Sequence, residues 1–297
     1  MESKQTGLVV AGDRRFHESI TTAMPLSALL LALGAAVVHA SWNMLLSDTE
    51  DTHSASAVAL LAGAVVFAPV ALIGWRFSAT AWPYVVSSSA LELLYIVLLA
   101  TAYSVAAMSF VYPIARGSAP VLVLAAGAVV TGATVSLSAG VGVVLVALGI
   151  VLVRGVHGGG RPRDLALALS VGACIAGYTL VDKHGVTHAN PIVYLEVVLG
   201  LTALAYAAGV WRLRGGAALR AAVTRKTLLA GVGFFGAYAL ALLALRLAPA
   251  ASVAAVRESS VVMATVFLAI TGREKIGAER LAGAIAVVVG IALISLG

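Results

Sequence analysis

The chain has 297 residues, of which 61% are hydrophobic and 11% are charged, and its mean hydropathy is +1.03. A soluble domain carries about 25% charged residues, so this composition excludes a soluble globular protein and predicts an integral membrane protein. The net charge of +6 comes from Lys and Arg residues that form no dense basic stripe, which argues against nucleic-acid binding.

Ten apolar runs follow a polar N-terminal segment, residues 1–24. The first run is longer than the apolar stretch of a cleaved secretory signal, roughly 7–15 residues, so we expect it to remain as a helix. Roughly twenty apolar residues cross the hydrocarbon core of a bilayer. The predicted spans are residues 25–46, 55–75, 85–106, 109–131, 138–153, 165–182, 192–211, 227–246, 250–271 and 278–296. The expected fold class is therefore an all-α integral membrane protein with ten transmembrane helices.

A polar segment rich in Gly and Arg, residues 154–164, predicts a flexible linker in the middle of the chain. It separates two halves, residues 25–153 and 165–297, each with five predicted helices. An odd number of crossings inserts the second half upside down relative to the first, so the halves would be inverted repeats. This plan is common among secondary transporters, which bind their substrate near the midplane between the repeats.

The two halves also share a pattern of residues. Arg116 and Arg257 occupy matching positions in the fourth predicted helix of each half. The fifth helices each carry two glycines at the same spacing, Gly142 and Gly149 in the first half and Gly283 and Gly290 in the second. A common origin of the halves explains the pattern, and a chance likeness between apolar helices is the alternative.

Four stretches of the sequence carry a family resemblance. They are HASWN at 39–43, YPIARGSAP at 112–120, YTLVDKHG at 178–185 and VRESSVVMATVFLAITGREKIGAERLAGAIAVVVGIALI at 256–294. Together they resemble the drug/metabolite transporter superfamily, and more narrowly its ten-helix permeases with two EamA-type repeats, over residues 25–297. The family usually carries a Gly-Glu pair after the fourth helix of each repeat. Here the second half has GREK at 272–275, whereas TGATVSLS at 131–138 of the first half has no acid.

The resemblance implies a helix bundle around a central cavity that opens to one side of the membrane at a time. Members of the family move amino acids, other small metabolites or drugs, often outward and often without a nucleotide. We therefore expect a secondary transporter (permease) that exports a small metabolite, such as an amino acid or a drug-like solute, by alternating access across a plasma (inner) membrane. A facilitator or uptake permease is the alternative within transport, and a membrane-embedded lipid-modifying enzyme is the alternative of another class.

The sequence has no phosphate-binding loop, no metal-ligand motif and no nucleophile motif. We therefore expect no enzymatic activity, no cofactor and no metal. The expected partners are a small-molecule substrate and the lipid bilayer, without nucleic acid. The oligomeric state stays open, and a monomer is compatible with the sequence.

Arg116 lies inside an apolar helix, where insertion of an arginine costs roughly 2.5–3.5 kcal/mol. Tyr112 lies one turn earlier on the same face, and Pro113 loosens the helix between them. Arg116 and Tyr112 are therefore candidates for binding a carboxylate or another anion of the substrate. The alternatives are a structural salt bridge of Arg116, with Glu92 as the nearest candidate, and snorkelling to the interface.

Glu92 shares a face of the third predicted helix with Tyr95, and both are substrate-binding candidates. A carboxylate removed from water can take up a proton near neutral pH, as a proton-coupling site requires. Glu92 is therefore also the candidate for proton coupling. The alternative is that it only neutralises Arg116.

Arg257 and Glu258 are candidates for lining the cavity in the second half. They are adjacent, so their side chains point about 100° apart on a helix and each needs a different partner. The alternative is structural pairing between helices.

His39 and Asn43 lie one turn apart on the first predicted helix, where His39 serves either as a proton relay or as a packed, hydrogen-bonded residue. On the sixth helix Tyr178 is the candidate for the cavity. Asp182 shares its face but lies near the helix end, where we expect it to cap the loop.

An even number of helices places both termini on the same side of the membrane. The family resemblance implies cytoplasmic termini, whereas the positive-inside rule favours termini outside, because most loop Lys and Arg residues would then be cytoplasmic. Those residues are Arg154, Arg161, Arg163, Arg212, Arg214, Arg220, Arg225, Lys226, Arg273, Lys275 and Arg280. The orientation therefore stays open.

Overall fold

The structure of the chain is a computed structural model that describes residues 24–46, 49, 51–105, 108–131, 135–154, 161–263 and 277–296. Within these residues the fold is all-helical, and the only strand-like contact is an isolated bridge between Phe77 and Ala189. The prediction of an all-α protein is therefore confirmed.

The helices of the first half follow the predicted apolar runs. They are α1 (Leu26–Leu46), α2 (Thr52–Ile73), the short 3₁₀ helix η1 (Ala79–Ala81), α3 (Trp82–Val105), α4 (Met108–Thr131) and α5 (Leu137–Arg154). Those of the second half are α6 (Pro162–Gly185), α7 (Pro191–Ala221), α8 (Arg225–Leu247), α9 (Ala250–Arg257) and α11 (Ala278–Leu296).

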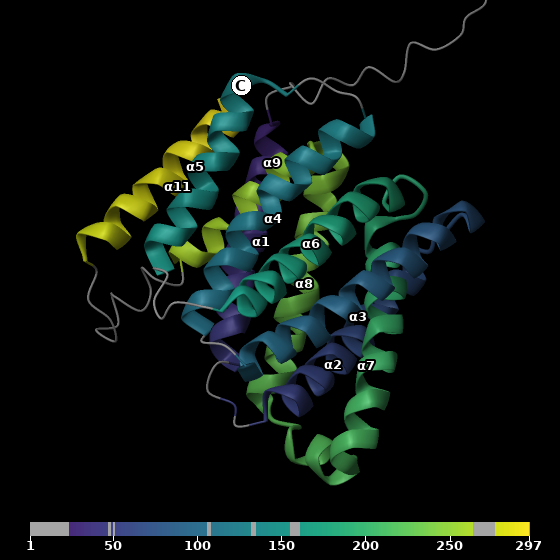
Figure 1. The fold of residues 1–297 in the computed structure, drawn as a ribbon. Coiled ribbons are helices and arrows are strands. Elements are labelled where there is room, and N and C mark those ends of the chain that lie inside the picture. The colour runs from purple at the N-terminus through teal and green to yellow at the C-terminus, as the bar shows by residue number, and fades with distance from the viewer. Residues whose placement is uncertain are drawn as a thin grey trace, which may run out of the picture.

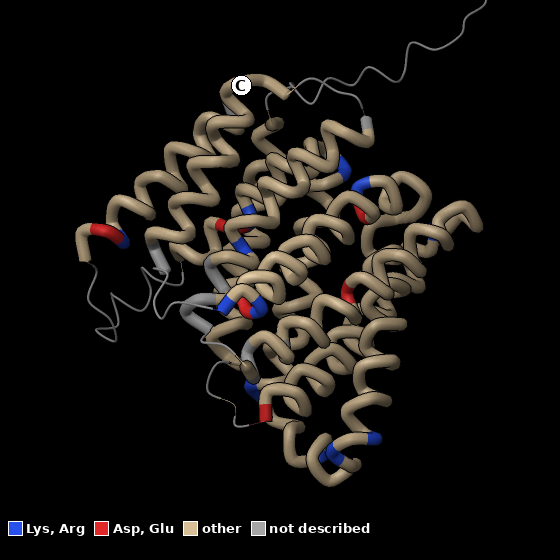
Figure 2. The backbone as a smooth tube through the Cα atoms, in the orientation of Figure 1, with Lys and Arg blue, Asp and Glu red and all other residues tan. Residues whose placement is uncertain are grey.

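Six segments are long and apolar enough to cross a membrane. They are Leu26–Leu46, Thr52–Ile73, Ala79–Leu99, Pro162–Gly185, Pro191–Ala221 and Arg225–Leu247. Two shorter apolar helical stretches, Ile114–Val130 and Leu137–Leu152, accompany them. Charged residues are sparse along the helices and gather mainly near their ends, with a few inside the bundle (Figure 2). These features indicate a multi-pass membrane protein, while the number of ten crossings stays a prediction.

Two helices of the second half differ from the predicted spans. α7 continues past residue 211 to Ala221, and its end turns at Gly215, whose φ of 81° suits a residue without a side chain. The span predicted over residues 250–271 is interrupted, because α9 ends at Arg257 and a turn follows at Glu258. Residues 264–271 of that span lie outside the described residues.

The helices pack as a bundle in which distant parts of the chain lie side by side (Figure 1). α5 packs along α11 at one side of the bundle. α1 packs on α8, α3 packs on α6, and α2 packs on α7 and α8. α4 contacts α5 on one side and α6 and α9 on the other, so it lies between the pair of α5 and α11 and the remaining helices.

Glycines allow α5 and α11 to approach each other closely. A Cβ atom added at Gly142 would lie 2.6 Å from the carbonyl oxygen of Gly290, and one added at Gly149 would lie 2.6 Å from that of Gly283. Small residues at such contacts let helix backbones pack directly in a membrane, where association relies on van der Waals contact. The glycines that suggested a repeat in the sequence therefore form the contact between these two helices.

Polar contacts hold the helix ends. The Lys183 ammonium donates to the carbonyl oxygens of Leu245 (2.7 Å) and Ala248 (3.0 Å), which satisfies the end of α8. Asp51 caps α2 and accepts a hydrogen bond from Arg214 of α7 at 2.8 Å. Burial alone would raise the pKa of Asp51, but hydrogen bonds from Ser54 and the Arg214 guanidinium outweigh it and hold the pKa below its usual value.

The close contact between α5 and α11 generates a prediction. Gly149→Ala should lower the free energy of unfolding by roughly 1–3 kcal/mol, because the added methyl group has no space. The measurement is thermal unfolding of the purified protein in detergent. Gly200→Ala in α7 is the matched control, since a Cβ atom there meets nothing within 4 Å. Equal stability of the two variants would contradict the close contact.

Candidate functional site

A central cavity lies where helices of both halves meet. It is lined by His39 and Trp42 of α1, Glu92 and Tyr95 of α3, Arg116 of α4, Tyr178 of α6, Phe234, Ala237 and Tyr238 of α8, and Arg257 of α9. Most of these groups are charged or aromatic, although the helices that carry them are mainly apolar.

The structure brings together most of the candidate residues from the sequence. Six of them line the central cavity: His39, Glu92, Tyr95, Arg116, Tyr178 and Arg257. Glu258 lies behind this lining and contacts Arg116. Asn43 is not a lining residue, because its amide donates to the carbonyl oxygen of His39 in its own helix at 2.9 Å. The side chain of Tyr112 lies outside the described part of the chain.

Arg116 forms a buried ion pair with a residue of the other half. Its Nη1 lies 3.0 Å from Oε1 of Glu258, and the two residues are 8% and 3% exposed. Glu92 was the nearest candidate for a structural salt bridge of Arg116, and that candidate is wrong because the observed partner is Glu258. The two residues are far apart in the sequence but meet where α4 packs against α9.

His39 completes this group, which we call the arginine cluster: Arg116, Glu258 and His39. Nη2 of Arg116 lies 2.5 Å from Nε2 of His39. A guanidinium group has no acceptor, so Nε2 must accept this hydrogen bond and the imidazole is neutral, with its proton on Nδ1. In the structure His39 is therefore a packed, hydrogen-bonded residue.

The turn at Glu258 directs two adjacent side chains to different neighbours. The amide of Glu258 is shared between the carbonyl oxygens of Ala254 (3.3 Å) and Ala255 (3.2 Å), which tightens the end of α9. Glu258 then meets Arg116 of α4, whereas the Arg257 guanidinium lies 5.8 Å above the ring of Tyr238 in α8. Apolar periodicity did not indicate this interruption.

Arg257 and Arg116 differ in what neutralises them. Among the described residues no carboxylate lies within ion-pair distance of Arg257, and its neighbour is the face of an aromatic ring. A cation above an aromatic ring gains about 0.5–2 kcal/mol, which is less than a buried carboxylate provides. Arg257 is therefore the cavity cation that remains available to an anion.

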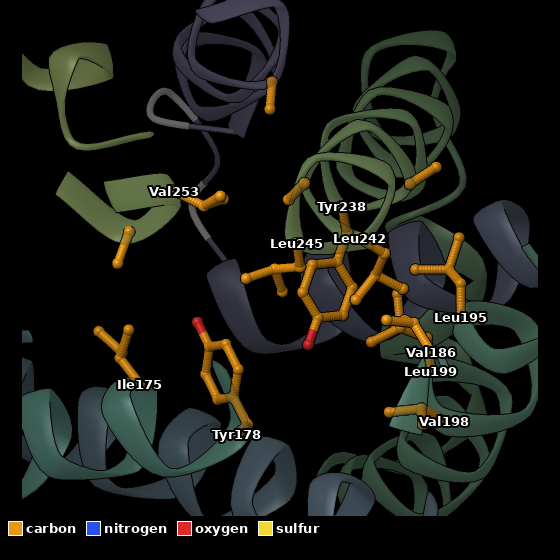
Figure 3. Close-up of a cluster of buried hydrophobic side chains, with 14 of the residues drawn as sticks. Ile175, Tyr178, Val186, Leu195, Val198, Leu199, Tyr238, Leu242, Leu245 and Val253 are labelled. Carbon is orange, nitrogen blue, oxygen red and sulfur yellow. The ribbon is translucent and has the colours of Figure 1, made fainter. Parts of the chain in front are cut away.

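Aromatic rings form two groups on the cavity wall. Trp42 packs edge-on against His39 (4.9 Å between ring centres) and Phe234 (5.1 Å). Tyr178 packs edge-on against Tyr95 and against Tyr238, each at 6.1 Å. Figure 3 shows the rings of Tyr178 and Tyr238, from α6 and α8, next to each other within the apolar core. Such rings offer apolar surfaces to an organic ligand.

Sequence reasoning missed Phe234, Ala237 and Tyr238 as lining residues. They are spaced three and four residues apart, so they share one face of α8. The signal that could have indicated them is a tyrosine in the middle of an apolar helix, because a buried hydroxyl needs a partner.

Asp182 does not cap the loop, as the sequence analysis expected. It is completely buried, and its carboxylate accepts hydrogen bonds from three hydroxyl groups: Ser88 of α3 (2.6 Å), Tyr194 of α7 (2.9 Å) and Tyr238 of α8. The expectation failed because α7 and α8 cover the end of α6. Tyr238 thus connects Asp182 to the central cavity.

The groups that line the site are able to bind a ligand. In the described part of the chain, no group of three or more His, Cys, Asp or Glu side chains is placed to hold a metal ion. The site offers one available cation, one carboxyl group at Glu92 and several aromatic surfaces. Such a set can hold an anionic or zwitterionic organic molecule.

The comparisons with known proteins concern the family and the fold. Residues 164–296 match the EamA-like transporter family. A crystal structure matches with a TM-score of 0.71 and 19% sequence identity, covering 91% of this chain and 98% of the other. At this identity the likeness shows the fold alone. No curated protein matches the chain.

The arginine cluster generates a prediction about stability. Arg116→Leu should lower the free energy of unfolding by roughly 3–5 kcal/mol, because it leaves the Glu258 carboxylate buried and unpaired. Adding Glu258→Leu should restore most of the loss. The measurement is thermal unfolding of both variants, with Arg257→Leu as the control that leaves no carboxylate unpaired. A double variant as unstable as the sum of its single changes would rule out the structural ion pair.

Proposed function

We propose that the protein is a secondary transporter of the drug/metabolite transporter superfamily. It moves a small metabolite, such as an amino acid or a drug-like solute, across the plasma membrane by alternating access, in the direction of export. The EamA-like domain at residues 164–296 and the six candidate spans support a membrane transporter. The observation that carries the proposal is the central cavity, in which ionisable groups are retained inside an otherwise apolar bundle.

The proposal includes two inverted repeats, residues 25–153 and 165–297. Reciprocal helix contacts support them. In the two repeats α1 corresponds to α6, and α3 corresponds to α8. The contact of α1 with α8 therefore corresponds to the contact of α6 with α3, and both contacts exist. The contacts between Gly142 and Gly290 and between Gly149 and Gly283 exchange in the same way. An approximate two-fold axis produces such reciprocity.

The repeats differ at the residue that follows the arginine. The shift that aligns Arg116 with Arg257 also aligns Gly117 with Glu258. A Cβ atom at Gly117 would lie only 3.2 Å from the carbonyl oxygen of Ala147 in α5, so this position has little room for a carboxylate side chain. Arg116 therefore has its counter-charge in the second repeat, while no described residue of the first repeat forms an ion pair with Arg257.

In this proposal Arg257 binds the anionic group of the substrate. Its guanidinium can hold a carboxylate through two parallel hydrogen bonds. Trp42, Phe234 and Tyr178 provide the surface for the organic part, and Glu92 lines the same cavity as a partner for an amino group. Arg116, the sequence-based candidate for this role, keeps a supporting role through its pair with Glu258.

A flux assay in proteoliposomes tests the transport proposal. The panel includes zwitterionic amino acids, organic carboxylates and the matching amides, which lack the negative charge. Accumulation or exchange of one member supports transport, and dependence on a gradient separates a secondary transporter from a facilitator. Chemical conversion of an added phospholipid without flux would support the lipid-modifying enzyme instead.

The role of Arg257 generates a prediction within this assay. Arg257→Lys keeps the charge but loses the paired donors, so flux of the best carboxylate at low concentration should fall about tenfold or more, corresponding to roughly 1.4 kcal/mol. Flux of the matching amide should change little. Equal losses for acid and amide would contradict an anion-binding role for Arg257.

The topology generates a second prediction. Reporter domains fused to the N-terminus and the C-terminus should face the same side of the membrane, because the proposed ten crossings are an even number. Activity of reporters that work only in the cytoplasm or only outside provides the measurement. Signals from opposite sides would exclude ten crossings, while the common side shows whether the family pattern or the positive-inside rule holds.

A further inference from the structure

We infer that Asp182 is a second proton-binding group, joined to Glu92 of the central cavity through the hydroxyl of Tyr238, and that the two carboxyl groups share one proton. This inference deepens the proposed function, and it rests on that function only for the use to which the proton is put. The three residues come from α6, α3 and α8.

The surroundings of Asp182 indicate a proton site rather than a structural ion pair. It is 0% exposed, and all three of its neighbours from α3, α7 and α8 are hydroxyl groups. Within the described chain neither Asp182 nor Glu92 has a cation at ion-pair distance. A buried carboxylate that lacks a cation keeps its charge only through such donors, and otherwise binds a proton.

The nearest charged groups do not change this conclusion. Lys183 follows Asp182 in α6, but its ammonium donates to carbonyl oxygens at the end of α8. Arg257 of α9 stabilises the charged forms of Asp182 and Glu92, and Arg116 of α4 stabilises that of Glu92, but neither arginine forms an ion pair with them. The Arg257 guanidinium lies over the Tyr238 ring, and Arg116 pairs with Glu258. Tyr178 of α6 packs against the same ring and brings no formal charge.

Tyr238 is placed to connect the two carboxyl groups. Its hydroxyl donates to Oδ2 of Asp182, so Tyr238 joins this buried carboxylate to the wall of the cavity that Glu92 also lines. Tyr238 and Glu92 both line the central cavity, whereas Asp182 is sealed behind them. A proton that enters the cavity therefore meets Glu92 first and Asp182 second.

The transfer exchanges one proton for another at the tyrosine. The Glu92 carboxyl group gives its proton to the Tyr238 oxygen while that oxygen releases its own proton to Oδ2 of Asp182. Tyr238 is neutral before and after, Glu92 becomes ionised, and Asp182 becomes neutral. The reverse transfer restores the first state, so a single negative charge alternates between the two carboxyl groups.

Sharing one proton avoids two costly states. Two ionised carboxylates close together in the interior repel each other, and each lacks a cation. Two interacting groups of this kind lose their protons in two steps that belong to the pair. In the transport cycle, Asp182 would hold the proton whenever Glu92 binds an amino group of the substrate.

The test uses infrared difference spectroscopy of the full chain in liposomes, with protons and deuterons as the only ligands. The carbonyl stretch of protonated carboxyl groups is recorded during a pH titration. In Asp182→Asn the Glu92 band should lose its proton at a pH lower by about one unit or more, because the neighbouring charge is gone. Glu92→Gln should shift the Asp182 band in the same way.

Hydrogen–deuterium exchange tests the connection itself. In Tyr238→Phe the Asp182 band should exchange at least about tenfold more slowly than in the wild type, because the ring can no longer pass a proton. Tyr206→Phe is the matched control, since Tyr206 bonds to His53 and lies outside the cavity. If Asp182→Asn does not fold, Glu92→Gln and Tyr238→Phe carry the test.

The outcomes separate this inference from the proposed function. Independent titration of the two carboxyl groups, or unchanged exchange in Tyr238→Phe, overturns the shared proton even if the protein transports a solute. Coupled titration with slow exchange in Tyr238→Phe supports the shared proton even if no flux is found. In that case the transport proposal fails alone.

Discussion

The cost of an unpaired charge in an apolar interior is the constraint on which the rest of this structure depends. Breaking a buried ion pair leaves a charge whose desolvation costs several kcal/mol, so each buried charge needs a partner. Arg116 and Glu258 satisfy each other across α4 and α9, and His39 adds an acceptor from α1. One ion pair thus holds helices from both halves around the central cavity. Because it uses Arg116 and Glu258, Arg257 is the cationic side chain that stays available to a ligand.

In the proposed inverted repeat, the arginine occurs in both halves but the neighbouring carboxylate occurs only in the second. Gly117 packs closely on α5, and Glu258, its counterpart, begins the turn that interrupts the helix of the second half. Packing in one half and a turn in the other therefore produce an asymmetric site from similar sequences. The asymmetry leaves Arg257 over the ring of Tyr238, where a substrate anion can compete with a weak interaction instead of a strong one.

The sequence predicted the helices well, because long apolar runs have no other stable structure in a membrane. It predicted most of the cavity residues from the cost of placing polar groups in such runs. It did not predict that Arg116 pairs with Glu258, because helix periodicity says nothing about contacts between distant segments. It also misassigned Asp182, because distance from a helix end does not measure burial: Tyr194 and Tyr238 cover that end from two other helices.

The two polar clusters join different sets of helices. The arginine cluster connects α1, α4 and α9, whereas the hydroxyl groups around Asp182 connect α3, α6, α7 and α8. Tyr238 lies on α8 and Arg257 on α9, so their contact is one more link between the two sets of helices, beside the packing of α1 on α8 and of α4 on α6. An anion that draws Arg257 away from the ring weakens this contact and leaves both clusters intact. In the proposed transport cycle, substrate binding therefore weakens the contact between α8 and α9 at the cavity, while the polar contacts within each cluster persist.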